Sequence, residues 1–303
     1  MNPHVEYILN NTTPPKWMGT NLHYVTIMGS VAYGCNNNEG ERSSKVSDLD
    51  LYGFCMPPKH IIFPHLHGHI RGFGKEPENF EQFQQHHIQN PTARKEYDVT
   101  IFSIIKYFQL LMDNNPNMID SIYTADNLVL HKTEIGSMVR DNRHLFLSKQ
   151  VKVKMAAYAY QQLRKLAGNI HAGSEARQDS INTVGYDVKK AYHTVRLMLQ
   201  AEQILMEGTL DLLANAEILK DIRAGNWTLE EVQNYFTNKE TLINSMYQTS
   251  SLQLKPDVER IKQLLINCIE HHYGSLSNAE LVVPNKHTAL VAEIESVLER
   301  YKK

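Results

Sequence analysis

The sequence lacks the features that mark secreted, membrane-spanning and disulfide-rich proteins. Its three cysteines, Cys35, Cys55 and Cys268, are odd in number and widely spaced, so they form neither a disulfide framework nor a CxxC zinc site. No apolar run reaches the length of about 18 residues that a membrane-spanning helix needs. The first residues lack the basic and then apolar pattern of a secretory signal, so the expected location is the cytoplasm, with no membrane partner.

An excess of charge of one sign is also missing. The 33 acidic and 31 basic residues give a net charge of −2, which excludes a global electrostatic attraction to nucleic acid or membrane. Any bound polyanion must therefore be held by a local cationic patch. With 42% hydrophobic and 21% charged residues the composition is that of a folded protein, and 303 residues suffice for about two domains.

Several motifs of common enzyme classes are absent. The sequence contains no GxSxG, HExxH or P-loop motif and no GxGxxG between a strand and a helix, which disfavours hydrolase, zinc protease, P-loop and Rossmann functions. The alternating histidines of 65–69 have no fourth zinc ligand at a convincing spacing, and the pairs at 86–87 and 271–272 are expected to diverge. Surface or core roles are therefore expected for these histidines.

The pattern of apolar residues divides the chain into a mixed first half and a helical second half. Strands are expected over 22–29, 49–56 and 96–102 and a helix over 104–113, while 64–91 has no clear period and is expected to be irregular or a short hairpin. Later helices are expected near 150–169, 187–207, 214–223, 228–247, 257–273 and 287–302. The expected fold is α+β, with a small mixed β-sheet domain over 1–148 and an all-helical domain over 149–303.

The sharpest local signal is SDLDLYG at 47–53. Because side chains alternate along a strand, Asp48 and Asp50 project from one face and the leucines from the other. Two carboxylates about 4 Å apart repel by about 4 kcal/mol at an effective dielectric constant of about 20, so either one keeps a proton or a cation lies between them. Oxygen ligands favour Mg²⁺ or Mn²⁺. A solvated strand edge is the alternative interpretation of this pair.

A third carboxylate, Asp98, lies on the expected strand EYDVTIF, where Val99 and Ile101 face the core. If this strand pairs beside 49–56, Asp98 joins the other two, and three carboxylates can hold two metal ions. Upstream, Gly29 and Ser30 follow a buried apolar strand. Glycine lets a phosphate approach the backbone and the serine hydroxyl can donate to it, although a plain turn also explains the pair.

In this order and context, the elements resemble the nucleotidyltransferase superfamily that includes DNA polymerase beta. The similarity covers about residues 22–102. The polar stretch over 35–46 is longer than the usual gap between Gly-Ser and the aspartates. The resemblance implies that Mg²⁺ or Mn²⁺ bound by the acidic residues aligns a nucleoside triphosphate for attack by a hydroxyl.

The segment 185–208 is predicted to form an amphipathic helix with a cationic row beside its apolar stripe. The stripe consists of Val188, Tyr192, Val195 and Leu199. The row consists of Lys189, His193 and Arg196. Like charges at this spacing are unfavourable without an anion, so a triphosphate would stabilise them; a solvated helix face is the alternative.

The pattern D-x-K-x-A-x-H-x-x-R-L from 187 to 197, followed by E-G-x-L and I-R-x-G, resembles one branch of the superfamily. This is the RNA-repair-associated, predicted nucleotidyltransferase branch that is also found in phages. With the Asn-Pro turn at 115–116 and LFLSKQ at 145–150, the similarity extends over about 22–225. It implies that Lys189, His193 and Arg196 contact the nucleotide phosphates and that RNA, a damaged or tRNA end, is the acceptor.

These features lead to one principal hypothesis, a metal-dependent nucleotidyltransferase. It would transfer a nucleoside monophosphate from an NTP to a hydroxyl and release pyrophosphate. The metal ligands would be Asp48, Asp50 and Asp98, with Asp98 also the candidate base. The phosphate ligands would be Gly29, Ser30, Lys189, His193 and Arg196. The alternatives are a catalytically silent nucleotide- or RNA-binding module, an enzyme that nucleotidylates protein, and a scaffold.

Overall fold

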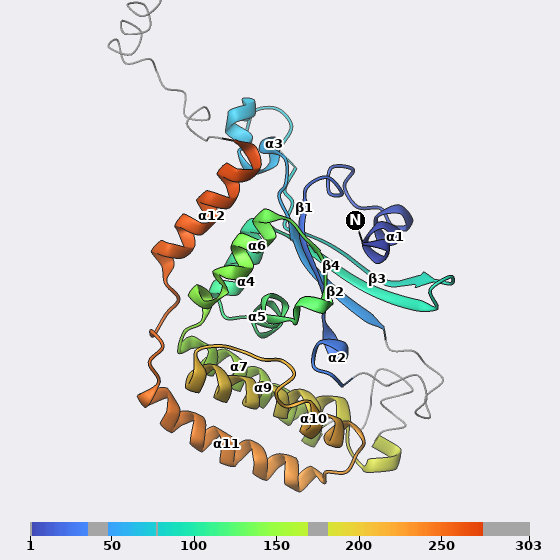
Figure 1. The fold of residues 1–303 in the computed structure, drawn as a ribbon, viewed down its shortest axis with the longest axis vertical. Coiled ribbons are helices and arrows are strands. Elements are labelled where there is room, and N and C mark those ends of the chain that lie inside the picture. Colours follow the sequence, from blue (N-terminus) through green and yellow to red (C-terminus); the bar gives the residue numbers. More distant parts are fainter. Residues whose placement is uncertain (1, 36–47, 77, 169–180, 275–303) are drawn as a thin grey trace, which may run out of the picture.

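The computed structural model describes residues 2–35, 48–76, 78–168 and 181–274. A five-stranded sheet occupies the first half (Figure 1). Its strands are β1 (Leu22–Ile27), β2 (Leu49–Cys55), β3 (Gln82–Asn90), β4 (Lys95–Ser103) and β5 (Val129–Lys132). Their spatial order is β3-β4-β2-β1-β5, and β2 and β4 run parallel while the other neighbours are antiparallel. The predicted mixed sheet and α+β class are therefore confirmed.

Six helices accompany the sheet within the described part of the first half. They are α1 (Pro3–Asn11), α2 (Gly29–Ala32), α3 (Lys59–Ile62), α4 (Ile104–Met112), α5 (Pro116–Tyr123) and α6 (Glu134–Asp141). The later helices are α7 (Gln150–Gly168), α9 (Val188–Glu207), α10 (Ala216–Arg223), α11 (Leu229–Thr249) and α12 (Val258–Tyr273). No helix of the described residues is both long and apolar enough to cross a membrane.

Two of the expected boundaries were wrong. The first strand ends at Ile27, because Gly29 adopts a left-handed φ of +67° and begins the short helix α2. The segment expected to be irregular through residue 91 contains β3 instead, whose mostly polar residues hide the strand pattern at the edge of the sheet. The helix expected over 287–302 lies outside the described residues.

The sheet is covered on both faces. Helix α1 packs on one face, where Val5 and Ile8 meet Leu51, Val99 and Ile101. Helices α4, α5 and α6 cover the other face, and the apolar core on this side continues without a break into α7 and α9. Helix α12 returns from the helical half to lie beside α4 and α6 (Figure 1). The domain boundary at residue 148 therefore stays a prediction.

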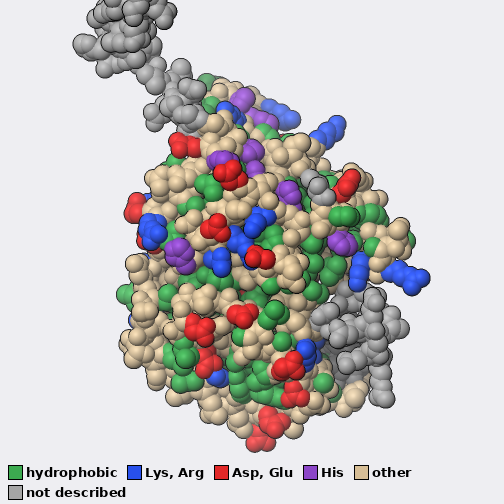
Figure 2. All heavy atoms as spheres, viewed as in Figure 1, with side chains coloured by type: hydrophobic (Ala, Val, Ile, Leu, Met, Phe, Trp, Pro, Cys, Tyr) green, Lys and Arg blue, Asp and Glu red, His purple; other side chains and the backbone are tan. Residues whose placement is uncertain are grey.

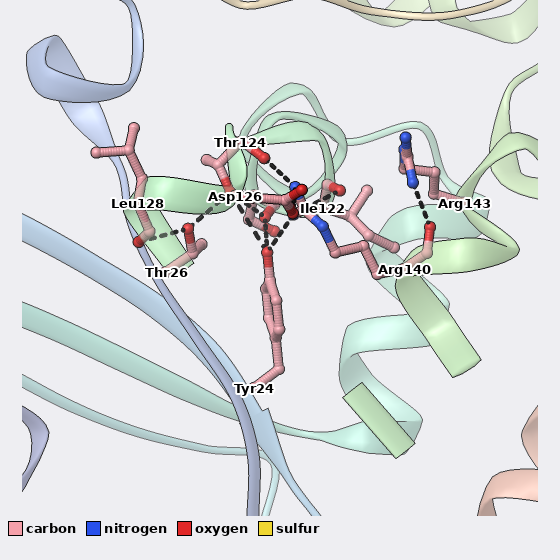
Figure 3. Close-up of polar contacts among 9 residues, drawn as sticks. Tyr24, Thr26, Ile122, Thr124, Asp126, Leu128, Arg140 and Arg143 are labelled. Carbon is pink, nitrogen blue, oxygen red and sulfur yellow. Dashed lines mark hydrogen bonds and ion pairs between the residues drawn. The ribbon is translucent and has the colours of Figure 1, made fainter. Parts of the chain in front are cut away.

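Helix α5 is tied to the sheet through its last carbonyl groups (Figure 3). The buried guanidinium of Arg140 donates to the Tyr24 hydroxyl at 2.8 Å, to the Ile122 carbonyl at 3.3 Å and to the Thr124 carbonyl. The Tyr24 hydroxyl in turn donates to the Ser121 carbonyl at 2.9 Å. Carbonyls at a helix C-terminus have no partner within the helix, so these side chains fix the end of α5 against β1.

Candidate functional site

Two of the predicted acidic residues lie side by side on the sheet. Strands β2 and β4 are parallel neighbours, and Asp50 pairs in register with Asp98. Side chains at paired positions point to the same face of a sheet, with the strands about 4.8 Å apart. The prediction that the two acidic strands are adjacent is therefore confirmed. Asp48 immediately precedes β2 and is exposed.

The carboxylates influence one another electrostatically. Burial raises the pKa of Asp50; Lys189 opposes this effect, while Asp98 and Asp48 raise the pKa further. Burial also raises the pKa of Asp48, and Glu96 and Asp98 add to the shift. A raised pKa means that the ionised form of the carboxyl group is disfavoured at this position. A cation bound between neighbouring carboxylates would stabilise their ionised forms.

The donor set suits a hard divalent cation, because it consists of carboxylate oxygens. Within the described ranges, however, no three His, Cys, Asp or Glu side chains already converge as metal ligands. Asp50 and Asp98 share a face, and Asp48 lies just before the first residue of β2. Metal binding by Asp48, Asp50 and Asp98 thus stays a prediction with which the residue types and the strand register agree.

Helix α2 begins directly against Asp50. A Cβ atom added to Gly29 would lie 2.1 Å from the Asp50 Oδ2 atom, and the φ of +67° is one that glycine adopts without strain. The Met28 amide donates to the Asp50 carbonyl at 2.7 Å, which fixes the strand-to-helix turn beside β2. Ser30 follows and is half-buried. Gly29 is therefore required by the close approach of its backbone to the carboxylate.

Helix α9 brings the predicted cationic row toward the same region. Its N-cap is Asp187, whose carboxylate accepts from the amides of Lys189 and Lys190 at 3.0 and 3.2 Å. The Lys189 side chain is exposed and near enough to lower the pKa of Asp50. One turn further along the helix, the half-buried His193 ring lies 4.9 Å from the Tyr192 ring.

Arg196, expected at the rim of the buried face beside the apolar stripe, lies inside it, with 4% of its surface exposed. Its guanidinium forms an ion pair with the fully buried Asp120 of α5 and bonds to the Tyr33 hydroxyl. Tyr33 donates to Asp120 at 2.5 Å and the Gln200 amide does so at 2.9 Å.

The burial of Arg196 has a simple cause. Helices α7, α10 and α11 all pack on α9, so little of its surface remains for solvent. A phosphate would have to compete with Asp120 for this guanidinium, and its predicted phosphate contact stays untested. The observed contacts join α9, α5 and Tyr33, the residue that follows α2.

Sequence reasoning missed the histidine that contacts Asp98. His86 of β3 places its Nδ1 atom 3.2 Å from Asp98 Oδ2, and the His87 amide donates to Asp98 Oδ1 at 2.8 Å. The expected divergence of the two rings was wrong: their centroids lie 6.3 Å apart, and His87 pairs with Glu96, which lies two residues before Asp98 on β4. The missed signal was the alternation of polar Gln84 and His86 on a strand next to an acidic strand.

Comparisons with known proteins identify the family of the chain. The RNA repair pathway DNA polymerase beta family matches residues 7–281. Among solved structures, the chain is similar to a nucleotidyltransferase-like protein from Exiguobacterium sibiricum 255-15, with 10% identity over 93% of this chain and 86% of that chain. The TM-score of that alignment is 0.27. No curated protein matches. Because the family match spans most of its length, the chain belongs to the RNA repair pathway DNA polymerase beta family.

Proposed function

We propose that this polymerase beta-like nucleotidyltransferase transfers a nucleoside monophosphate from an NTP to a hydroxyl group of RNA. The family match supports the reaction class. The observation that carries the proposal is the in-register pair of Asp50 and Asp98, with the Gly29 backbone against Asp50 and Lys189 close by. Acidic groups beside a cationic side chain and a glycine turn are the parts that a metal–triphosphate complex requires.

Asp48, Asp50 and Asp98 would hold the cation, Mg²⁺ or Mn²⁺. When bound, such an ion lowers the pKa of an attacking hydroxyl and neutralises charge on the triphosphate. Burial, and then the neighbouring carboxylates, raise the pKa values of Asp48 and Asp50, and a bound cation would stabilise both as anions, which supports this assignment.

The other residues of the site would bind and orient the NTP. The backbone amide of Gly29 and the hydroxyl of Ser30 would donate to a phosphate. The space where a Cβ of Gly29 would lie is filled by the Asp50 carboxylate. Lys189 would attract the phosphates as a point charge, and His193 would contact them one turn further along α9. Such positioning and charge neutralisation supply most of the catalysis in phosphoryl transfer.

In the transfer itself, the acceptor oxygen forms a bond to the α-phosphorus of the NTP. The bond from that phosphorus to the oxygen bridging it to the β-phosphate breaks, and pyrophosphate leaves. Asp98, the candidate base, takes the proton of the acceptor hydroxyl. The Asp98 side chain is 23% exposed, so an acceptor can reach its carboxylate.

RNA is the acceptor that the family description favours. The net charge of −2 favours contact with a short RNA end, damaged or from a tRNA, over a long polyanion footprint. On the face in Figure 2, acidic and basic side chains are interspersed, in keeping with a local contact. A hydroxyl group of a protein is the second candidate acceptor, and a module that binds nucleotide without turnover is the third.

The test is incubation with each α-labelled NTP, Mg²⁺ and total RNA. We expect label to enter RNA with wild-type protein and to disappear with Asp50→Asn, which keeps the size of the side chain and removes its charge. Label on protein instead of RNA would identify a protein-nucleotidylating enzyme. Equal labelling by wild-type protein and Asp50→Asn would refute the assignment of this site.

A further inference from the structure

Strand β3 carries a bulge directly opposite Asp98. The register between β3 and β4 pairs Gln85 with Val99 and Ile88 with Tyr97, so two residues of β3, His86 and His87, stand opposite the single residue Asp98. His87 takes a left-handed φ of +56°, which is uncommon for a residue with a side chain. Bulges of this kind bend a strand and re-aim its side chains, and they are frequent beside active sites.

The bulge engages both oxygens of the Asp98 carboxylate. The His87 amide donates to Oδ1 at 2.8 Å, and the Nδ1 atom of His86 lies 3.2 Å from Oδ2. The two contacts come from neighbouring residues and grip the carboxylate from the edge strand of the sheet. Asp98 is therefore restrained in rotation about its side-chain bonds, next to Asp50 on the adjoining strand.

Glutamines on β3 fix which nitrogen of His86 carries the proton. The Gln82 amide nitrogen lies 3.3 Å from the Gln84 side-chain oxygen, and the Gln84 amide nitrogen lies 2.8 Å from His86 Nε2. Because an amide nitrogen only donates, Nε2 of a neutral His86 accepts and Nδ1 carries the hydrogen. The Nδ1 edge of the ring then faces the Asp98 carboxylate, at the ion-pair distance of 3.2 Å from Oδ2.

Packing of the core does not explain this arrangement. The His86 side chain is 51% exposed, and β3 is an edge strand whose glutamines also point to solvent. Histidine at position 86 therefore adds little apolar burial, and its polar contacts are with Gln84 at 2.8 Å and Asp98 at 3.2 Å.

We propose that His86, oriented by Gln84, is a positioning residue that presets the Asp98 carboxylate for the cation it shares with Asp50. This inference rests on the proposed function, because it assigns His86 to the outer shell of that metal site. Outer-shell partners of metal-ligating carboxylates orient them, and their loss typically weakens metal affinity or activity by about 10–100-fold.

The test measures binding of Mn²⁺ alone, with free Mn²⁺ counted by electron paramagnetic resonance. We expect His86→Ala to weaken Mn²⁺ binding by about 10–100-fold, and His86→Asn, which keeps an N–H donor near the position of Nδ1, to stay within about threefold of wild type. Gln89→Ala is the matched control, because Gln89 is an exposed polar residue of the same strand that bonds to Glu96 and not to Asp98. It should bind Mn²⁺ as wild type does.

Thermal unfolding of each variant separates a loss of fold from a loss of positioning, and His86→Ala is expected to melt with wild-type protein because its side chain is half exposed. Equal Mn²⁺ affinity of His86→Ala and wild type would overturn the role of His86 and leave the metal site intact. If wild-type protein and Asp50→Asn bind Mn²⁺ equally weakly, the proposed function fails, and the role of His86 fails with it.

Discussion

The main effect predicted for Arg196→Ala is a loss of folding stability and not a loss of nucleotide binding. In the folded chain, Asp120 is completely buried and Arg196 is 4% exposed. The carboxylate has three partners, with Arg196 and the Tyr33 hydroxyl on Oδ2 and the Gln200 amide on Oδ1. Removal of the guanidinium leaves a carboxylate in the core with only neutral donors.

The magnitude follows from that burial. Breaking a buried ion pair by removing one partner typically costs about 3–5 kcal/mol, because the remaining charge is uncompensated. Burial raises the pKa of Asp120, so the carboxylate can take up a proton once Arg196 is gone, which limits the loss. We expect the free energy of unfolding of Arg196→Ala to fall by about 3 kcal/mol or more. Asp120→Ala should lose a similar amount.

A double-mutant cycle in urea measures the coupling directly. Wild-type protein, Arg196→Ala, Asp120→Ala and the double variant are unfolded and followed by circular dichroism. Each single variant leaves the other charge buried without its partner. The free energy of unfolding of the double variant should therefore fall by less than the sum of the two single losses, with a coupling of about 2 kcal/mol or more. Additivity within about 0.5 kcal/mol would refute the ion pair as a structural contact. Loss of NTP affinity in Arg196→Ala at unchanged stability would instead support its predicted phosphate role.

Two further predictions concern β1 and the turn after it. Burial, and then the neighbouring His272, lowers the pKa of His23 to about 4. Below about pH 6.5 the unfolded chain therefore binds more protons than the folded one, so the free energy of unfolding should fall by about 3 kcal/mol between about pH 6.5 and 4. In His23→Gln, the urea midpoint should depend less on pH over this range. A pH-independent wild type would contradict this. Gly29→Ala should cost at least about 1 kcal/mol and weaken Mn²⁺ binding, because its Cβ would lie 2.1 Å from the Asp50 carboxylate. Wild-type binding by that variant would place Asp50 elsewhere.

The acidic centre was predictable because its pattern is local. The alternation of residues around Asp50, and likewise around Asp98, predicts which face of the sheet each side chain occupies. The apolar residues that alternate with these aspartates identify both strands as buried. The pairing of β2 with β4 then brings the two aspartates together. Gly29 was singled out for a close approach of phosphate to the backbone, whereas in the folded chain it is the Asp50 carboxylate that lies against it.

The other contacts depend on partners far apart in the chain. The helix pattern placed Arg196 at the rim of the buried face and not within it, because periodicity within α9 does not show the helices around it or Asp120, 76 residues earlier. Strand β3 was hidden because polar residues at its exposed positions and the bulge at His86 and His87 interrupt the period of two. A polar edge strand is identified by its neighbour more than by its own sequence.

The most direct test of the acidic centre is diffraction from crystals grown with Mn²⁺ and a non-hydrolysable NTP analogue. Anomalous scattering locates Mn²⁺ independently of its ligands. We predict an anomalous peak bound by the carboxylates of Asp50 and Asp98, with the phosphates of the analogue between that ion and Lys189. An ion and nucleotide bound elsewhere, with the two aspartates bare, would contradict the proposed nucleotidyl-transfer site.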